Sequence, residues 1–202
     1  MKDFERGNFY HLYNRGNAGQ DIFLERENYR FFLQQMGKYF QTSGIETIAY
    51  CLMPNHFHIL VFLAEGSDVS GTLQSFLTSY VKSFHRWHRT SGHLFEGPFQ
   101  AKLVDSDEYL ALLARYIHLN PVRARLAKNP EDWEFSNYRD WLSDTLEDAI
   151  LFARVRNPFI GDAYAYRQFV ENAIEEERAR EKIEQFLFGK LRKKPDFSRG
   201  MN

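Results

Sequence analysis

The stretch Ile45–Leu63, IETIAYCLMPNHFHILVFL, decides the fold. Its two halves, Ile45–Met53 and His56–Leu63, are rich in β-branched, aromatic and other apolar residues. Such runs favour extended strands, and the Pro54-Asn55 pair between them is typical of a tight turn. The stretch therefore predicts a β-hairpin.

Two further strands and two amphipathic helices are predicted around this hairpin. Phe9–Arg15 alternates aromatic and polar residues and ends at a Gly-Asn turn signal, and Phe99–Val104 also has the character of a strand. Asn28–Thr42 and Ser70–Arg89 carry apolar residues at helical spacing, each closed by a Ser-Gly pair. The resulting order matches the ferredoxin-like split βαβ fold, an α+β class with an antiparallel sheet, helices on one face and the other face open.

A third helix is predicted directly after this unit. Asp105, with Glu108 three residues later, resembles a capping box and marks the start of the helix. Pro121 predicts its end at Asn120, because the residue before a proline is pushed out of the α region.

The chain changes character beyond Trp141. We expect one domain over residues 1–141 and a C-terminal helical extension over residues 142–202. The extension is predicted to comprise an acidic linker, a charged helix from about Ala163 to Lys190, and a basic tail with a disordered end.

The composition constrains the kind of metal site that the chain could form and its location in the cell. The chain has 202 residues, a formal net charge of −1 and one cysteine, Cys51, so a metal site would need nitrogen and oxygen ligands rather than thiolates. The first residues are charged where a signal peptide is apolar, and the longest apolar stretch, Ile59–Ala64, is too short to span a bilayer. We therefore expect no membrane segment and a cytoplasmic location.

A net charge near zero argues against a protein that binds nucleic acid nonspecifically over its whole surface. Any DNA contact must therefore depend on basic residues that cluster in one part of the surface. Basic residues do gather in two groups, although such runs are also typical of solvated helix faces. The groups are Lys82, His85, Arg86, His88 and Arg89, and Arg115, His118, Arg123, Arg125 and Lys128. From these groups and the first strand, the DNA-binding candidates are Arg15, Lys82, Arg86, Arg89 and Arg123.

The hairpin also carries two histidines that could share a metal ion. Side chains alternate across a strand, so His56 and His58 point to the same face, where two imidazoles can bind one ion. An H-x-H pair is also compatible with a purely structural role. Two imidazoles leave most of the coordination sphere empty, which calls for a third protein ligand and for substrate oxygens.

Asn120 and Tyr116 lie four residues apart on one face of the third predicted helix. The Asn120 amide oxygen could supply the third ligand, although an Asn-Pro pair is also typical of a helix end. Most helical tyrosines serve packing. The ordinary pKa of a phenol is about 10, so Tyr116 becomes a useful nucleophile only beside a cation or a base, and the histidine pair offers that setting.

Several segments resemble the HUH single-tyrosine transposases, and most closely their REP-associated tyrosine transposase branch. They are Phe9-Tyr10-His11-Leu12-Tyr13-Asn14-Arg15-Gly16, Met53-Pro54-Asn55-His56-Phe57-His58-Ile59-Leu60, Gly92–Phe99, Tyr116–Ala124 and Trp133–Tyr138. In order, these segments cover most of residues 8–141.

The resemblance implies a specific chemistry for this chain. His56 and His58, with Asn120 as a third ligand, would hold a divalent ion, Mg or Mn. Tyr116 would attack a phosphate of single-stranded DNA near a hairpin, leaving a 5′-phosphotyrosine and a free 3′-hydroxyl. The protein would act as a monomer or a homodimer.

Two alternatives stay open at the level of the sequence. One is a nonenzymatic DNA-binding protein derived from a transposase, which would grip single strands by phosphate contacts and stacking. The other is a metal-dependent phosphodiester hydrolase in which Tyr116 only packs. Trapping of a covalent protein–DNA adduct would discriminate between them.

Overall fold

The structure is a computed structural model that describes residues 4–64, 68–143 and 161–189. Four antiparallel strands form one sheet: β1 (Phe9–Arg15), β2 (Ile45–Met53), β3 (His56–Leu63) and β4 (Gln100–Val104). Their order across the sheet is β2-β3-β1-β4. This is the order of a ferredoxin-like split βαβ unit, so the predicted α+β fold class is confirmed.

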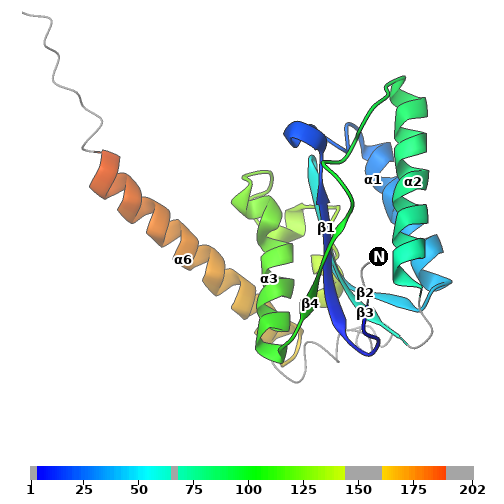
Figure 1. Ribbon diagram of the computed structural model, residues 1–202. Coiled ribbons are helices and arrows are strands. Elements are labelled where there is room, and N and C mark those ends of the chain that lie inside the picture. Colours follow the sequence, from blue (N-terminus) through cyan, green and yellow to red (C-terminus); the bar gives the residue numbers. More distant parts are fainter. Residues whose placement is uncertain (1–3, 65–67, 144–160, 190–202) are drawn as a thin grey trace, which may run out of the picture.

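Helices cover both faces of the sheet. Helices α1 (Arg26–Gln41) and α2 (Val69–His88) lie together on one face, as predicted, and α3 (Asp107–Arg123) lies on the other (Figure 1). The expectation of an open second face was therefore wrong, because α3 buries apolar side chains against it. The remaining helical elements are η1 (Asn17–Gly19), η2 (Pro130–Asp132), α4 (Tyr138–Trp141) and α6 (Ala163–Gly189).

The alternation of side chains along β3 divides the core in two. Phe57, Ile59, Val61 and Leu63 pack with α1 and α2, whereas Leu60 packs with α3. Because strand side chains alternate, His56 and His58 share the α3 face with Leu60. The strand thus places both imidazoles beneath the third helix.

Helix α3 differs from its prediction at both ends. Its N-cap is Ser106, whose hydroxyl accepts from Tyr109 N, rather than Asp105. Its C-terminal end lies at Arg123, so Pro121 is inside the helix instead of ending it. A proline in a helix leaves the carbonyl four residues earlier without its backbone donor. That carbonyl belongs to Ile117, and the Asn120 Nδ2 group donates to it at 3.4 Å.

The start of α6 packs against α3 and α4 around a buried histidine. His118 is fully buried, with Nδ1 2.6 Å from the Tyr166 hydroxyl and Nε2 3.1 Å from Asn137 Oδ1. The prediction that placed His118 in a surface basic group was therefore wrong. Trp141 packs on the Tyr166 ring with 4.5 Å between ring centroids. The division at residue 141 stays a prediction.

Most of the predicted linker and the whole basic tail lie outside the described residues. The charged helix predicted from about Ala163 corresponds to α6. None of the described helices is long and apolar enough to cross a membrane.

Candidate active site

The two histidines of β3 lie side by side on the α3 face. Their ring centroids are 5.1 Å apart. The register of the sheet places His58 opposite Tyr13 of β1 and His56 opposite Arg15. The hairpin and its antiparallel neighbour therefore determine the position of the pair, as the spacing of the two histidines predicts.

Helix α3 brings Tyr116 to the same place. Leu113 and Ile117 anchor the helix in the core, whereas Tyr116 at the edge of this apolar stripe is 40% exposed. Its ring centroid lies 5.4 Å from that of His58. The guanidinium carbon of Arg123 lies 5.2 Å from the centroid of the Tyr116 ring. A solvent-accessible phenol thus lies close to both the histidine pair and a cation.

Asn120 completes the cluster from the last full turn before Pro121. Its Nδ2 group donates to the Tyr116 carbonyl at 2.9 Å and to Ile117, so the amide is held by the helix itself. The side chain is only 8% exposed and interacts with His56, where its hydrogen bond favours the protonated imidazole. The Asn120 oxygen therefore faces the histidine pair.

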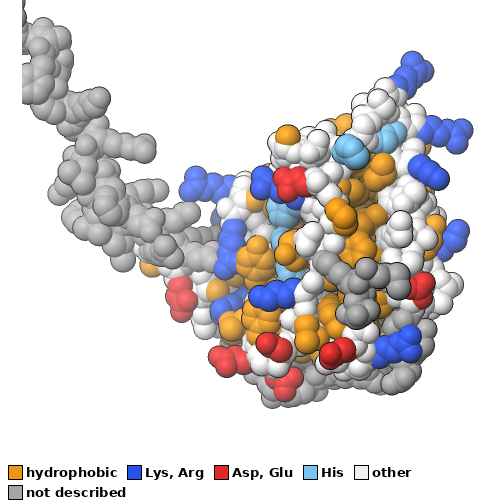
Figure 2. Space-filling model, viewed as in Figure 1, with side chains coloured by type: hydrophobic (Ala, Val, Ile, Leu, Met, Phe, Trp, Pro, Cys, Tyr) orange, Lys and Arg blue, Asp and Glu red, His pale blue; other side chains and the backbone are white. Residues whose placement is uncertain are grey.

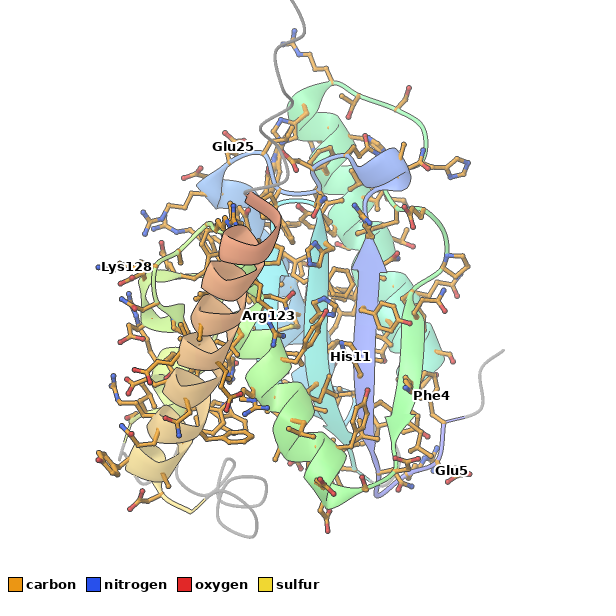
Figure 3. The ribbon with its side chains drawn as sticks, turned by 90° about the vertical axis from the view of Figure 1, so that its left-hand side faces the viewer. Phe4, Glu5, His11, Glu25, Arg123 and Lys128 are labelled. Atoms are coloured by element: carbon orange, nitrogen blue, oxygen red, sulfur yellow. The ribbon has the colours of Figure 1, made fainter. Side chains whose placement is uncertain are left out.

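His11 of β1 also belongs to the cluster, although the sequence did not single it out. His11 Nε2 lies 2.9 Å from His58 Nδ1. Figure 3 shows His11 on the sheet face that α3 covers, with Arg123 over the same side. The signal was present in the alternation of β1, which puts His11, Tyr13 and Arg15 on one face.

Burial keeps these imidazoles neutral. Burial, with the neighbouring His11 and His56, lowers the pKa of His58 to about 3. Burial and the charge of Lys102 lower the pKa of His11 to about 4. The pKa of His56 is also lowered, by burial and by Arg15. Neutral imidazole is the form that binds metal ions.

The donor set fits a divalent ion that shares its coordination sphere with substrate. Among residues 4–64, 68–143 and 161–189, no group of three His, Cys, Asp or Glu side chains could hold a metal. Two imidazoles and one amide oxygen instead give three protein donors of nitrogen and oxygen type. Such an open set suits Mn or Mg with phosphate oxygens as the remaining ligands.

A cavity of about 470 Å³ opens beside Tyr116. Its walls come from β1, β3, β4 and α3, and they include the rings of His11, His58, Tyr109 and Tyr116, together with Lys102. The Lys102 ammonium lies 5.3 Å from the centroid of the Tyr109 ring. The cavity therefore joins aromatic surface and a cation to the candidate nucleophile.

The five predicted DNA-binding residues fall into two places. Arg15 and Arg123 flank His56 and Tyr116, as described above. Lys82, Arg86 and Arg89 are exposed and come from α2, on the opposite face of the sheet. Figure 2 shows Lys and Arg side chains along the outer side of α2. The structure thus separates these candidates into a group at the site and a group on α2.

The comparisons with known proteins identify the family. A family model described as transposase IS200 like matches residues 9–120, more than half of the chain. The chain belongs to the IS200-like transposase family. A Haemophilus influenzae relative named as a REP-associated tyrosine transposase is 28% identical over 104 residues, which are 46% of this chain and 58% of the relative. The match thus spans less than two thirds of that relative.

A solved structure supports the fold of this IS200-like transposase. It is described as a REP-associated tyrosine transposase bound to a REP hairpin. It shares 19% sequence identity with a TM-score of 0.56, and the match covers 71% of this chain and 87% of the other. The residues that match the family model include β1, β3 and α3 up to Asn120. They therefore contain the four predicted site residues His56, His58, Tyr116 and Asn120.

Proposed function

We propose that this transposase is a metal-dependent single-stranded DNA transesterase that cleaves and rejoins DNA near hairpins. Tyr116 is the nucleophile, and His56, His58 and Asn120 hold the divalent ion, Mg or Mn. The observation that carries the proposal is the meeting of an exposed phenol with the two strand histidines, at 5.4 Å between the Tyr116 and His58 rings. The 40% exposure of Tyr116 leaves the phenol accessible to a DNA phosphate.

The chemistry exchanges one phosphate ester for another. The Tyr116 oxygen forms a bond to phosphorus, the bond from phosphorus to the 3′-oxygen breaks, and the phenol proton is lost while the leaving oxygen gains one. The product is a 5′-phosphotyrosine and a free 3′-hydroxyl, and the reverse reaction rejoins the strand. A bound divalent ion would polarise a nonbridging phosphate oxygen.

DNA hairpins are the proposed substrate class. The related structure holds a REP hairpin, and the H. influenzae relative bears the same family name. Arg15 and Arg123 would contact the phosphates next to the scissile bond, and the α2 group would contact phosphates farther along the strand. We place the protein in the cytoplasm, together with its DNA substrate.

Adduct trapping tests this proposal. The full chain is incubated with end-labelled single-stranded hairpin DNA, with Mn²⁺, with Mg²⁺ or with a chelator, and resolved on a denaturing gel. We expect a covalent protein–DNA band with either metal and none with the chelator. Cleavage without an adduct would transfer the assignment to a hydrolase, and binding without cleavage would transfer it to a nonenzymatic DNA-binding protein.

A further inference from the structure

Each histidine of the proposed metal pair has its Nδ1 atom engaged by a neighbouring side chain. His56 Nδ1 lies 2.6 Å from Asn55 Oδ1, and His58 Nδ1 lies 2.9 Å from His11 Nε2. In neutral imidazole one ring nitrogen donates and the other accepts, so the partner at Nδ1 determines what Nε2 can do. The two contacts therefore bear on metal binding even though neither partner is a ligand.

The Asn55 contact has only one direction. The Asn55 Nδ2 group donates to the Gly19 carbonyl at 3.3 Å, which fixes which end of the amide is oxygen. An amide oxygen only accepts hydrogen bonds, so His56 Nδ1 must carry the proton. In the neutral ring, which has a single proton, the Nε2 atom of His56 consequently keeps its lone pair, and the hydrogen bond to the Asn120 oxygen forms only when the ring gains a second proton.

The His11 contact is made edge to edge. The two rings are tilted by 26° with centroids 5.0 Å apart, and this separation together with the short nitrogen–nitrogen distance places the hydrogen bond near both ring planes. One of the two nitrogens must donate. If His58 Nδ1 donates to His11, the Nε2 atom of His58 has a free lone pair for a metal. If His11 Nε2 donates to His58, the single proton of neutral His58 lies on its own Nε2 atom and blocks metal binding there.

We propose that His11 and Asn55 are positioning residues that hold His58 and His56 in the Nδ1–H tautomer and so present both Nε2 atoms to the divalent ion. This inference rests on the proposed function, because it takes the two histidines as metal ligands. Partners at the second ring nitrogen commonly fix the tautomer and orientation of metal-binding histidines, and their loss costs about 10- to 100-fold in metal affinity or activity. His11 is buried at 8% exposure, which limits competition from solvent for the contact.

Three variants of the full chain separate this role from a structural one. His11→Leu fills similar space but offers no acceptor, whereas His11→Gln places an amide oxygen near the position of Nε2. His93→Leu removes an exposed histidine outside the cluster and serves as the control. Calorimetric titration with Mn²⁺ should show an affinity loss of about 10- to 100-fold for His11→Leu, a smaller loss for His11→Gln and no change for the control.

The tautomer itself is the second readout. Nitrogen-15 NMR of the metal-free wild-type protein should show His58 protonated at Nδ1, and His11→Leu should show a mixture of tautomers or protonation at Nε2. Asn55→Asp keeps an acceptor oxygen and should leave His56 in its Nδ1–H form, whereas Asn55→Ala should not. If His11→Leu does not fold, the wild-type spectrum and the His11→Gln variant still test whether His11 holds His58 in the Nδ1–H tautomer.

The outcomes distinguish failure of this inference from failure of the proposed function. Wild-type binding of Mn²⁺ with unchanged affinity and unchanged His58 tautomer in His11→Leu would overturn the role of His11 and leave the metal site standing. Wild-type protein that binds no Mn²⁺ would overturn the metal site and this inference together. Protonation of wild-type His58 at Nε2 would also contradict the inference.

Discussion

At the scale of single residues, the site depends on which atom each side chain offers. His56 and His58 offer ring nitrogens, and Asn120 offers an oxygen because its amide nitrogen is already used by the helix carbonyls. An imidazole nitrogen is a stronger donor to a transition-metal ion than a neutral amide oxygen, which water resembles. The three proposed ligands should therefore differ in how much metal affinity each supplies.

We predict that His56→Ala or His58→Ala removes most divalent-metal binding, and that Asn120→Ala weakens it by a smaller factor. Titration calorimetry with Mn²⁺ measures all three, with far-ultraviolet circular dichroism to establish that each variant is folded. Cys51→Ala is unsuitable as a control because Cys51 is buried, so exposed His93→Ala is preferred. Wild-type affinity in both histidine variants would rule out this metal site.

At the scale of secondary-structure elements, α2 presents an apolar face to the core and an exposed basic face to solvent. Leu73, Phe76, Tyr80 and Phe84 are buried, whereas Lys82, Arg86 and Arg89 are exposed. Trp87, in the last turn of α2, is 45% exposed and packs edge-on against Phe31. The basic face is accessible to phosphates.

Replacing Lys82, Arg86 and Arg89 together with alanine should weaken hairpin DNA binding and flatten its dependence on salt. Each phosphate contact to single-stranded DNA contributes about 0.7 to the slope of log affinity against log salt, so the slope should fall by about 2. Fluorescence anisotropy over a range of salt concentrations measures it. Arg30→Ala with Lys38→Ala, two exposed cations of α1, is the control. An unchanged slope in the triple variant would show that α2 makes no phosphate contacts.

At the scale of the whole molecule, α6 is joined to the body through the buried His118. Burial raises the pKa of the Tyr166 hydroxyl well above its usual value and lowers that of His118 to about 4, so both groups are neutral and depend on their mutual hydrogen bond. A buried polar group that loses its partner costs about 1–3 kcal/mol.

Tyr166→Phe should therefore lower the free energy of unfolding by about 1–3 kcal/mol. Tyr164→Phe is a matched control from the same turn, because Tyr164 is 71% exposed and its change should stay within about 0.5 kcal/mol. Urea denaturation at neutral pH compares the two. Equal stability of both variants and the wild type would mean that the His118 contact adds nothing to stability.

Much of the fold could be predicted because its signals are local. The hairpin Ile45–Leu63, with its Pro-Asn turn, matches β2 and β3 at both ends, and the period of α1 and α2 gives their buried faces. The position of α3 over the second face is a tertiary effect, which no local pattern reveals. The same holds for Pro121, whose missing donor is offset by a side chain.

The candidate site divides in the same way. His56 and His58 stand out because they share a strand face, and Asn120 and Tyr116 because they share a helix face. The alternation of β1 gives the face on which His11 lies, but it does not show that His11 contacts His58. That contact depends on the pairing of β1 with β3, which places His11 opposite Leu60 and next to His58. His118 looked like a surface cation because sequence spacing does not show that α6 covers it.

The most direct test of the central claim is adduct formation by Tyr116→Phe, with Tyr109→Phe as the matched control from the wall of the same cavity. Both variants keep the ring and the proposed metal ligands and lose one oxygen. With saturating metal and labelled single-stranded hairpin DNA, we predict that Tyr116→Phe loses the covalent adduct and strand cleavage together while its DNA affinity persists. Tyr109→Phe should retain both activities. Cleavage by Tyr116→Phe at a near wild-type rate would contradict the assignment of Tyr116 as the nucleophile.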